Sequence, residues 1–472
     1  MAEMAQILGS PAGRAGRTGT ARHVLAPAAA GPRTRRAQLA LASGAIWLPM
    51  AAACGSPAAS TTNTAQPAGC RSRIEYFCRL RVDQGVNPHI LPAFASASPN
   101  CSLDVTTIPS TELQAKLLTS IVGGTPPAVV DLPPGWTKQM QASGLLTSVD
   151  DLFKRDKLTK DEFARGLWEQ MSFLGKVWFM PGQQTNADFV LFWNKALFRE
   201  AGLDPEKGPT TIAELDTMVG KLTRQTGADF ERVGMVPWDL YGHGNTIQAW
   251  GRAFGGEFYD DKKDEPTFVH PRVQRAVEWY TGWAKRLDAA RVIAFRSSVT
   301  PPGGVHWFGS GRFGLMVLVA SAVAGIRQFN PALELAAGPM PGEAPGKPGT
   351  VSVGGWAVGA VPSPKREAAW EFLKFFGATP EGTNAVVRYG DVPGWLKAPG
   401  LAELSKDPLS KAFVDGLRRA EFPQLGFYTP GGWDANPIQD IIDGKRGVRE
   451  VLDQINADAV RRHTDWKSQT KK

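Results

Sequence analysis

The sequence predicts an α/β protein built from two domains. Its 472 residues exceed what one ordinary hydrophobic core holds, so two domains of roughly 200 residues each are expected. From Ile74 onward, short apolar runs alternate with stretches of helical periodicity, which is the pattern of α/β architecture. A hydrophobic content of 43% with 21% charged residues is typical of a folded globular chain.

The expected elements follow in chain order. Three segments combine apolar and β-branched residues and are predicted as strands: 74–77, 103–108 and 128–131. Four segments place apolar residues three or four positions apart, as the buried face of a helix does: 110–124, 211–222, 273–287 and 363–376. Thr211-Ile-Ala-Glu214 matches a capping box, and Pro364 suits the first turn of a helix.

The first 53 residues have the order of an export signal. Arg35-Arg36 precedes an apolar run, Leu39–Ala53, which ends at Cys54. Gly44 and Pro49 interrupt the run, and it is shorter than the stretch of about 20 apolar residues that a transmembrane helix needs. We therefore expect residues 1–53 to be a signal peptide that is removed before Cys54.

Two local patterns refine this expectation. Ala51-Ala-Ala-Cys54 resembles a bacterial lipobox, in which the cysteine is lipidated, and Arg35-Arg36 resembles the twin-arginine export signal. Residues 54–71 are rich in Ser, Thr, Ala and Pro and are predicted to be a flexible tether. The alternative is an ordinary secretory signal with a coincidental cysteine. The long stretch before the arginine pair leaves the translation start open.

Three further cysteines, Cys70, Cys78 and Cys101, follow the proposed anchor. A disulfide is chemically allowed outside the cell, but three thiols leave one unpaired and the sequence does not specify the pairing. Of the three pairings, we name Cys78 with Cys101 as the prediction.

The charge balance gives little support to a nucleic-acid partner. Six Arg and one Glu in residues 1–53 account for +5 of the formal net charge of +8, which leaves +3 for the remainder. The remainder carries no basic run beyond Lys471-Lys472, so no phosphate-binding stripe is expected.

Seven short sequences, taken in order across residues 74–460, resemble the family 1 extracellular solute-binding proteins of ABC importers, the maltose-binding-protein-like clan. The segments are 126–131, 142–150, 190–203, 209–215, 309–316, 354–358 and 368–374. The resemblance implies a two-lobed α/β fold of the type II periplasmic-binding-protein kind, with hinge crossings and a ligand cleft between the lobes. By analogy, residues 72–186 and 350–404 form lobe one, and residues 187–349 and 405–472 form lobe two.

The resemblance also implies a function. The chain is expected to capture a carbohydrate and deliver it to the transmembrane subunits of an ABC permease, as a monomer, without catalytic residues or a cofactor. It is expected to be exported and held by lipid on Cys54 at the outer face of the cytoplasmic membrane, or to be periplasmic.

Tryptophan is unusually frequent, with 15 Trp against 6 Tyr, and its broad apolar face suits sugar rings. Trp193, Trp279, Trp283 and Trp370 lie in strand or helix patterns and are expected to pack in the core. Five others lie among Gly, Pro or Asp, in stretches that line the cleft in the family, and about three of them are expected to touch ligand. These five are Trp136, Trp238, Trp356, Trp395 and Trp433; Trp250 is a weaker sixth candidate.

Polar candidates accompany these aromatics. Carboxylates and amides that could bind sugar hydroxyls are Asp83, Asp131, Asn186, Asp188, Asp239 and Asp434. The alternative for each aspartate is a solvated or helix-capping role, which is at least as good an account of Asp83 and Asp188. Arg79 and Arg81 stand where the family more often has neutral residues, so an anionic group on the ligand is a further alternative.

Other classes of function have weaker support. A secreted glycoside hydrolase would also combine carboxylates with aromatics, but the chain has no zinc-protease, serine-hydrolase or complete phosphate-loop motif. No metal site is predicted, because the histidines are scattered: His23, His89, His243, His270, His306 and His463. A polyamine, a sugar phosphate or another small solute is the alternative cargo.

Overall fold

The computed structural model describes residues 72–109, 112–132, 136–182, 189–344, 357–419 and 436–470. The first part of the chain forms a five-stranded sheet whose order is β2-β1-β3-β14-β6. Its strands are β1 (Arg73–Cys78), β2 (Ser102–Thr107), β3 (Val129–Leu132), β6 (Phe179–Pro181) and β14 (Ala357–Ala360). β1 runs parallel to β2 and β3, whereas β14 is antiparallel to β3 and β6. A late segment of the chain therefore completes an early sheet.

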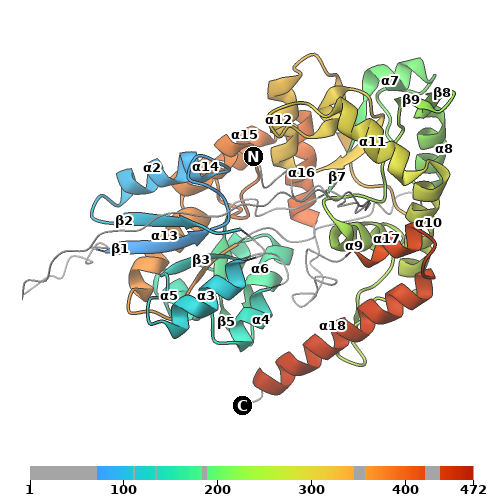
Figure 1. Ribbon diagram of the computed structural model, residues 1–472. Coiled ribbons are helices and arrows are strands. Elements are labelled where there is room, and N and C mark those ends of the chain that lie inside the picture. Colours follow the sequence, from blue (N-terminus) through green and yellow to red (C-terminus); the bar gives the residue numbers. More distant parts are fainter. Residues whose placement is uncertain are drawn as a thin grey trace, which may run out of the picture. The chain divides into compact units, whose positions relative to one another are not determined.

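Aromatic packing joins this sheet to a helix from far along the chain. α2 (Asn87–Ala97) and α3 (Leu113–Val122) make the crossovers, and α13 (Arg366–Ala378) and α14 (Pro380–Tyr389) are added later. The Phe372 ring lies 5.3 Å from Tyr76 of β1 and 5.1 Å from Phe94 of α2. α2 and α14 lie on one side of the sheet and α3 and α5 (Asp150–Arg155) on the other (Figure 1).

A second, three-stranded sheet forms in the middle of the chain. β7 (Val190–Asn194) lies between β12 (Leu315–Leu318) and β13 (Leu335–Gly338), and both neighbours are antiparallel to it. All five residues of β7 are buried. The indole of Trp193 donates to the Pro205 carbonyl at 2.9 Å. A Cβ at Gly208 would lie 2.6 Å from the Trp193 ring, so this glycine permits the close packing.

The remaining elements lie outside the two sheets. Those near the first sheet in sequence are α4 (Thr137–Ala142), η1 (Lys160–Glu162), α6 (Arg165–Met171), β4 (Ser172–Phe173), β5 (Lys176–Val177) and α15 (Gly400–Leu404). Those around the second are α7 (Lys195–Glu200), α8 (Ile212–Leu222), β8 (Arg224–Thr226), β9 (Asp229–Arg232), α9 (His243–Ala253), β10 (Tyr259–Asp260), β11 (Glu265–Pro266), α10 (Pro271–Arg286), α11 (Ala289–Val299), η2 (Trp307–Ser310), α12 (Ala320–Phe329), α16 (Pro408–Arg419), α17 (Pro437–Ile442) and α18 (Val448–Thr470). Within the described ranges, no helix is both long and apolar enough to cross a membrane.

The predicted strands and helices are confirmed with small shifts at their ends. The capping box forms, because Thr211 Oγ1 accepts the Glu214 N–H at 3.1 Å while the Glu214 carboxylate accepts the Thr211 N–H. The helix predicted to open at Pro364 begins instead at Arg366. The Ser363 hydroxyl accepts the Lys365 N–H at 3.3 Å, so a serine turn occupies the residues before the helix. The four tryptophans expected to pack do so, with Trp279 partly buried.

The predicted Cys78–Cys101 disulfide is wrong. Cys101 is disulfide-bonded, whereas Cys78 is a buried thiol outside any disulfide, and it accepts a hydrogen bond from Asn87 at 3.3 Å. The reason is the strand register. Arg73 pairs with Ser102 and Cys78 with Thr107, so the two cysteines stand at opposite ends of parallel strands. At roughly 3.3 Å per residue, they are too far apart for a disulfide, whose Cα atoms lie within about 7 Å.

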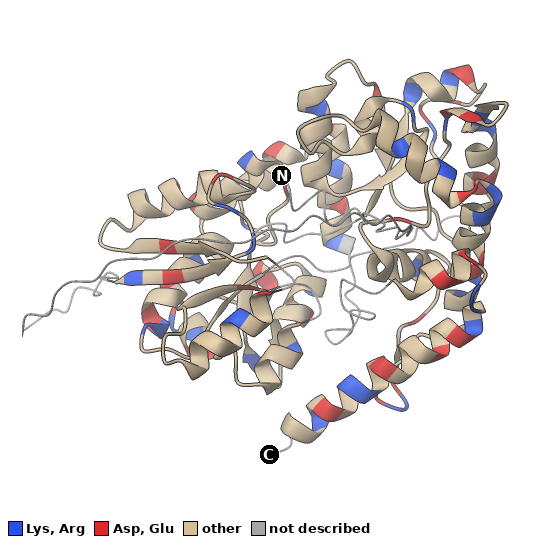
Figure 2. Cartoon of the chain, viewed as in Figure 1, with Lys and Arg blue, Asp and Glu red and all other residues tan. Residues whose placement is uncertain are grey.

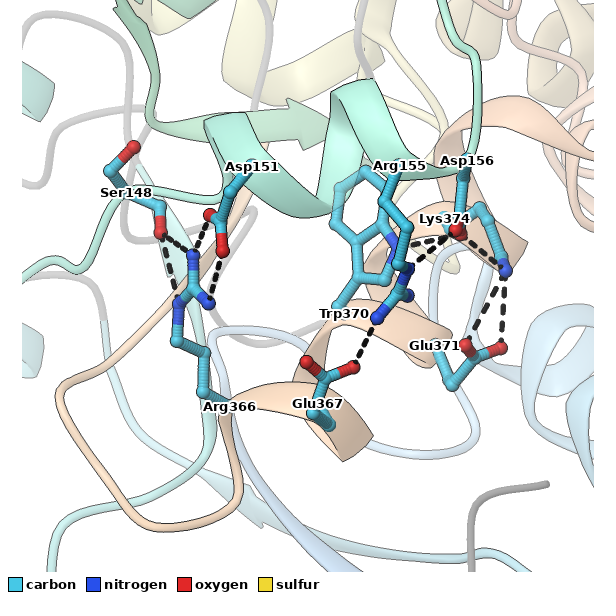
Figure 3. A network of polar contacts seen from close by, with 9 residues as sticks. All are labelled: Ser148, Asp151, Arg155, Asp156, Arg366, Glu367, Trp370, Glu371 and Lys374. Atoms are coloured by element: carbon cyan, nitrogen blue, oxygen red, sulfur yellow. Dashed lines mark hydrogen bonds and ion pairs between the residues drawn. The ribbon is translucent and has the colours of Figure 1, made fainter. Parts of the chain in front are cut away.

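A polar network ties α5 to α13 (Figure 3). Arg366 binds Asp151 and the Ser148 carbonyl, and Arg155 reaches Glu367 at 2.7 Å. Asp156 accepts from Trp370 at 2.9 Å and from Lys374 at 2.8 Å. Burial works to raise the pKa of Asp156, but hydrogen bonds from Arg155, Lys374 and Trp370 outweigh it, so the pKa lies well below its usual range. The network therefore favours the ionised carboxylate.

Asp156→Asn is expected to lower the free energy of unfolding by about 1–3 kcal/mol at pH 7, because charge-assisted hydrogen bonds are lost. Since the folded-state pKa is depressed, the stabilisation is complete above the unfolded-state value near ~4. It disappears as the pH falls through the lower folded-state value. Urea unfolding at several pH values checks this. Glu403→Gln, which removes a pair whose side chains are 72–73% exposed, should change stability by under about 0.5 kcal/mol. A wild-type advantage over Asp156→Asn that stays constant down to pH 2 would contradict the account.

Candidate functional site

One group of candidate residues lies at the carboxyl ends of β1 and β3. The chain leaves β1 toward β2 on one side, and β3 pairs on its other side, so the strand order reverses at this point. In open parallel sheets, ligands bind outside the carboxyl ends of the strands at such a switch point. Asp83 and Trp136 follow these two strand ends, and Asp131 is the last residue but one of β3.

Asp131 is entirely buried at this edge. One carboxylate oxygen accepts from the Tyr76 hydroxyl, and the other accepts the Arg79 N–H at 3.0 Å. Burial raises the pKa of Asp131, while the positive charge of Arg79 and the hydrogen bonds act in the opposite direction. The carboxylate therefore holds the backbone of Arg79 in place just after β1. Because Asp131 is buried, its role is to position this loop from inside the protein.

Asp83 and Trp136 are more accessible. Asp83 is exposed and pairs with Arg81, whose Nε lies 3.1 Å from Oδ1. Trp136 is partly buried, stands before the first turn of α4 and packs against the core. The two arginines that suggested an anionic ligand thus each have a carboxylate nearby, Asp131 for Arg79 and Asp83 for Arg81.

A second group lies around the segment between β9 and α9. Trp238 is 8% exposed, and the neighbouring Asp239 accepts from Arg296 at 2.6 Å. Trp250 is fully buried, and its indole N–H donates to the Pro237 carbonyl at 2.7 Å. Its ring lies 4.7 Å from that of Trp279. This geometry gives Trp250 a packing role.

Sequence reasoning missed three aromatic residues beside this group. Tyr241 adopts φ 55°, followed by Gly242 at φ 99°, and strained backbone of this kind often occurs at functional sites. The Tyr241 ring stacks on Phe189 with centroids 5.9 Å apart, and its hydroxyl accepts the Val319 N–H at 3.5 Å. His306 lies 5.7 Å from the Tyr241 ring. Because Val319 follows β12 and Phe189 precedes β7, the cluster stands at one edge of the second sheet.

The remaining candidates have varied positions. Trp395 is 9% exposed, and its indole N–H donates to Glu162 at 3.1 Å. Six candidates lie outside the described residues: Trp356, Asn186, Asp188, Trp433, Asp434 and Cys54.

In the described ranges, no group of three or more His, Cys, Asp or Glu side chains has the arrangement of a metal site. Along α18, basic and acidic residues are interspersed (Figure 2).

Comparison of the chain with known protein families identifies its family. The model of the bacterial extracellular solute-binding proteins matches residues 81–382, so the chain belongs to this family. The maltotriose-binding protein of Pyrococcus abyssi is 22% identical over 329 residues. That match covers 67% of this chain and 66% of the relative, which is just under two thirds of the relative's length.

Solved structures give the fold. CpMnBP1 with mannobiose bound has a TM-score of 0.68 at 20% identity, covering 83% of this chain and 100% of its own. The sugar-binding protein MalE from Xanthomonas citri has a TM-score of 0.64 at 16% identity, with 85% and 100% covered. UgpB from Mycobacterium tuberculosis, in complex with glycerophosphocholine, has 0.63 at 20%, with 85% and 98% covered. The predicted two-lobed α/β fold of the periplasmic binding proteins is thereby confirmed.

Tyr76→Phe is expected to lower the free energy of unfolding by about 1–3 kcal/mol, because it removes the hydroxyl that donates to a buried oxygen of Asp131. Tyr280→Phe is the matched control. Tyr280 is equally buried, but its hydroxyl has no hydrogen-bond partner among the described residues, so its loss should be neutral or slightly stabilising. Denaturant unfolding of both variants measures the difference. Equal costs for the two substitutions would show that the bond to Asp131 is not what stabilises the sheet edge.

Proposed function

We propose that the protein captures a neutral carbohydrate in a cleft between its lobes and delivers it to the transmembrane subunits of an ABC importer. One observation carries the proposal: the described candidate residues combine aromatic rings with carboxylates that already form ion pairs with arginines. Membership of the solute-binding family supports the binding role and an exported protein. The maltotriose- and mannobiose-binding relatives support a saccharide as the cargo.

The pairing of charges favours a neutral solute. Asp83 forms an ion pair with Arg81, and Asp239 forms one with Arg296. The positive charge of Arg79 acts to lower the pKa of Asp131. An ion pair that is already satisfied gains little from a charged ligand, and breaking the pair of Arg296 with Asp239 would leave a partly buried charge uncompensated. Such groups can still accept or donate hydrogen bonds to hydroxyls at the edge of the pair.

The aromatic rings supply the complementary surface. A sugar presents an apolar C–H face, which packs on an aromatic ring, and an equatorial rim of hydroxyls, which needs polar partners. Trp136 near the first sheet and the stacked pair Phe189–Tyr241 near the second are suitable platforms. We propose these residues as ligand contacts, together with Trp238, Asp83 and Asp239, and we keep Asn186, Asp188, Trp356, Trp433 and Asp434 as candidates from the sequence.

We also propose the lobe boundaries 72–186 with 350–404, and 187–349 with 405–472. In support, the five-stranded sheet uses strands between residues 73 and 181 and again at 357–360, while the three-stranded sheet uses strands between residues 190 and 338. The chain must therefore pass between the sheets near residues 182–189 and again before residue 357. Hinge motion at such crossings would close the lobes over the solute and signal its presence to the permease.

A charged solute is the second candidate, and one finding favours it. UgpB, whose structure holds glycerophosphocholine, has the same fold and a similar TM-score. A zwitterionic or anionic ligand would have to compete with the pairs at Arg81 and Arg296 for their guanidinium groups. We place this candidate below a neutral saccharide for that reason. We further propose that the protein acts as a monomer and without catalysis.

A thermal-shift panel separates these candidates. Maltotriose, mannobiose and mannotriose represent neutral saccharides, and spermidine, glycerophosphocholine and glucose 6-phosphate represent charged solutes. A ligand that binds only the folded state stabilises it by about 2.7 kcal/mol at 100 times its Kd, so the melting temperature should rise with a neutral saccharide alone. A shift with spermidine or a phosphate ester and with no saccharide would reject the carbohydrate assignment. Turnover of chromogenic glycosides that disappears on mutating a site carboxylate would reject the non-enzymatic role.

We propose in addition that lipid on Cys54 anchors the exported protein, and that residues 1–53 are removed. Cys54→Ser is then expected to release the protein from the membrane fraction while leaving its affinity for solute unchanged, because the tether separates the anchor from the folded lobes. Fractionation of cells, followed by the same thermal-shift panel, measures both properties. A Cys54→Ser protein that stays membrane-bound would contradict the anchor, and one that no longer binds solute would contradict the division of the chain.

A further inference from the structure

His306 holds a fixed hydrogen bond on one side of its ring. It precedes η2, and its Nδ1 accepts the Phe308 N–H at 3.2 Å. A nitrogen that accepts a backbone N–H must carry a lone pair. The proton of the neutral imidazole is therefore on Nε2, which becomes a hydrogen-bond donor.

The imidazole lies beside the aromatic cluster. The Tyr241 ring lies 5.7 Å from the imidazole, and Trp307 lies 4.6 Å from it. The imidazole is only partly buried, and none of the described residues accepts a hydrogen bond from Nε2. The cluster therefore presents a donor beside the stacked Phe189–Tyr241 pair with nothing described to receive its proton.

The charged groups around the ring keep it neutral. Burial, reinforced by the positive charge of Arg296 on α11, lowers the pKa of His306 to about 3. Arg296 itself binds Asp239 and lies over the Trp307 ring, 5.8 Å from its centroid. Burial also raises the pKa of Tyr241, so its hydroxyl stays protonated. His306 therefore remains a neutral donor throughout the physiological pH range.

A second polar group lies nearby in the chain. The Ser321 hydroxyl oxygen, two residues after Val319, is shielded from solvent and has no hydrogen-bond partner among the described residues. Val319 donates its N–H to the Tyr241 hydroxyl, which places the start of α12 beside the same cluster. Buried hydroxyls normally have partners, so the shielded Ser321 hydroxyl is a second polar group that a ligand bound at this cluster could satisfy.

We propose that His306 binds the solute directly, by donating a hydrogen bond from Nε2 to a hydroxyl or ring oxygen of a neutral saccharide that packs against Tyr241. This inference rests on the proposed function of the site and adds a residue that neither the sequence patterns nor the family comparison assigned. It also gives the site a donor whose charge does not change with pH.

The test compares variants that separate the two hydrogen bonds of the imidazole. His306→Leu removes both nitrogens, whereas His306→Gln keeps an N–H donor in reach of the site. With maltotriose and mannotriose as probes in titration calorimetry, His306→Leu should weaken binding about tenfold and His306→Gln by about threefold or less. Binding by the wild type should stay constant from pH 5 to pH 8.

His270 provides a matched control for the loss of the cap. Its Nδ1 accepts the Arg272 N–H at 3.2 Å at the start of α10, with backbone angles within a degree of those at His306. His270→Leu therefore removes the same type of capping bond away from the aromatic cluster and should leave affinity unchanged. Equal losses of affinity in His270→Leu and His306→Leu would overturn the proposal, as would unchanged affinity in His306→Leu or a fall in wild-type affinity below pH 6.5.

A second measurement does not depend on a ligand. Nitrogen NMR of histidine-labelled protein, assigned through His306→Gln, should show a neutral ring protonated on Nε2 from pH 5 to pH 8. A ring protonated on Nδ1, or one that titrates near pH 6.5, would overturn the proposal. If neither saccharide binds the wild type but the NMR spectra show a neutral ring protonated on Nε2, the proposed carbohydrate cargo is wrong. The assignment of His306 Nε2 as a hydrogen-bond donor is then still supported.

Discussion

The buried hydrogen bonds of Asp131 are the constraint on which the first sheet edge depends. A carboxylate with no exposed surface is costly to bury unless its oxygens are occupied, and here Tyr76 and the Arg79 N–H occupy both. These bonds connect the interior of β1, the end of β3 and the first residue after β1. The path of the chain toward Asp83 is therefore set by an interaction inside the sheet rather than by the loop itself.

The same edge depends on segments that arrive much later in the chain. Tyr76 donates to Asp131 from a ring that packs on Phe372 of α13, and β14 pairs with β3 along its whole length. The network around Asp156 then ties α13 to α5 on its other side. Because residues 357–378 complete the sheet and its core, the packing behind the candidate residues near β1 and β3 depends on this late segment.

Local features could be predicted from the sequence, and features that depend on distant contacts could not. The capping box at Thr211 and the strand at 74–77 follow from residues adjacent in the chain, and both were found. The Cys78–Cys101 pairing failed because strand register decides it. Loop-like composition could not separate Trp238 and Trp395, which are buried, from the more accessible Trp136. Tyr241 and His306 were missed because only the fold brings residues 65 positions apart to one sheet edge. The Gly242 that follows Tyr241 was the one local signal of strained backbone.

The two candidate groups share a design that bears on selectivity. Each sets a carboxylate against a guanidinium, Asp83 with Arg81 and Asp239 with Arg296, and Arg296 also lies over the Trp307 ring. Paired charges have fixed directions and need no rearrangement when an uncharged molecule arrives, so the polar groups are preorganised for hydroxyls. A ligand that carried its own charge would have to displace Asp239 or Arg296 from their pair, and the other member would lose its partner in a partly buried position. Discrimination against charged solutes thus follows mainly from this pair, because the pair of Asp83 with Arg81 is exposed. Discrimination among neutral sugars must come from single hydrogen bonds such as the one that His306 can donate.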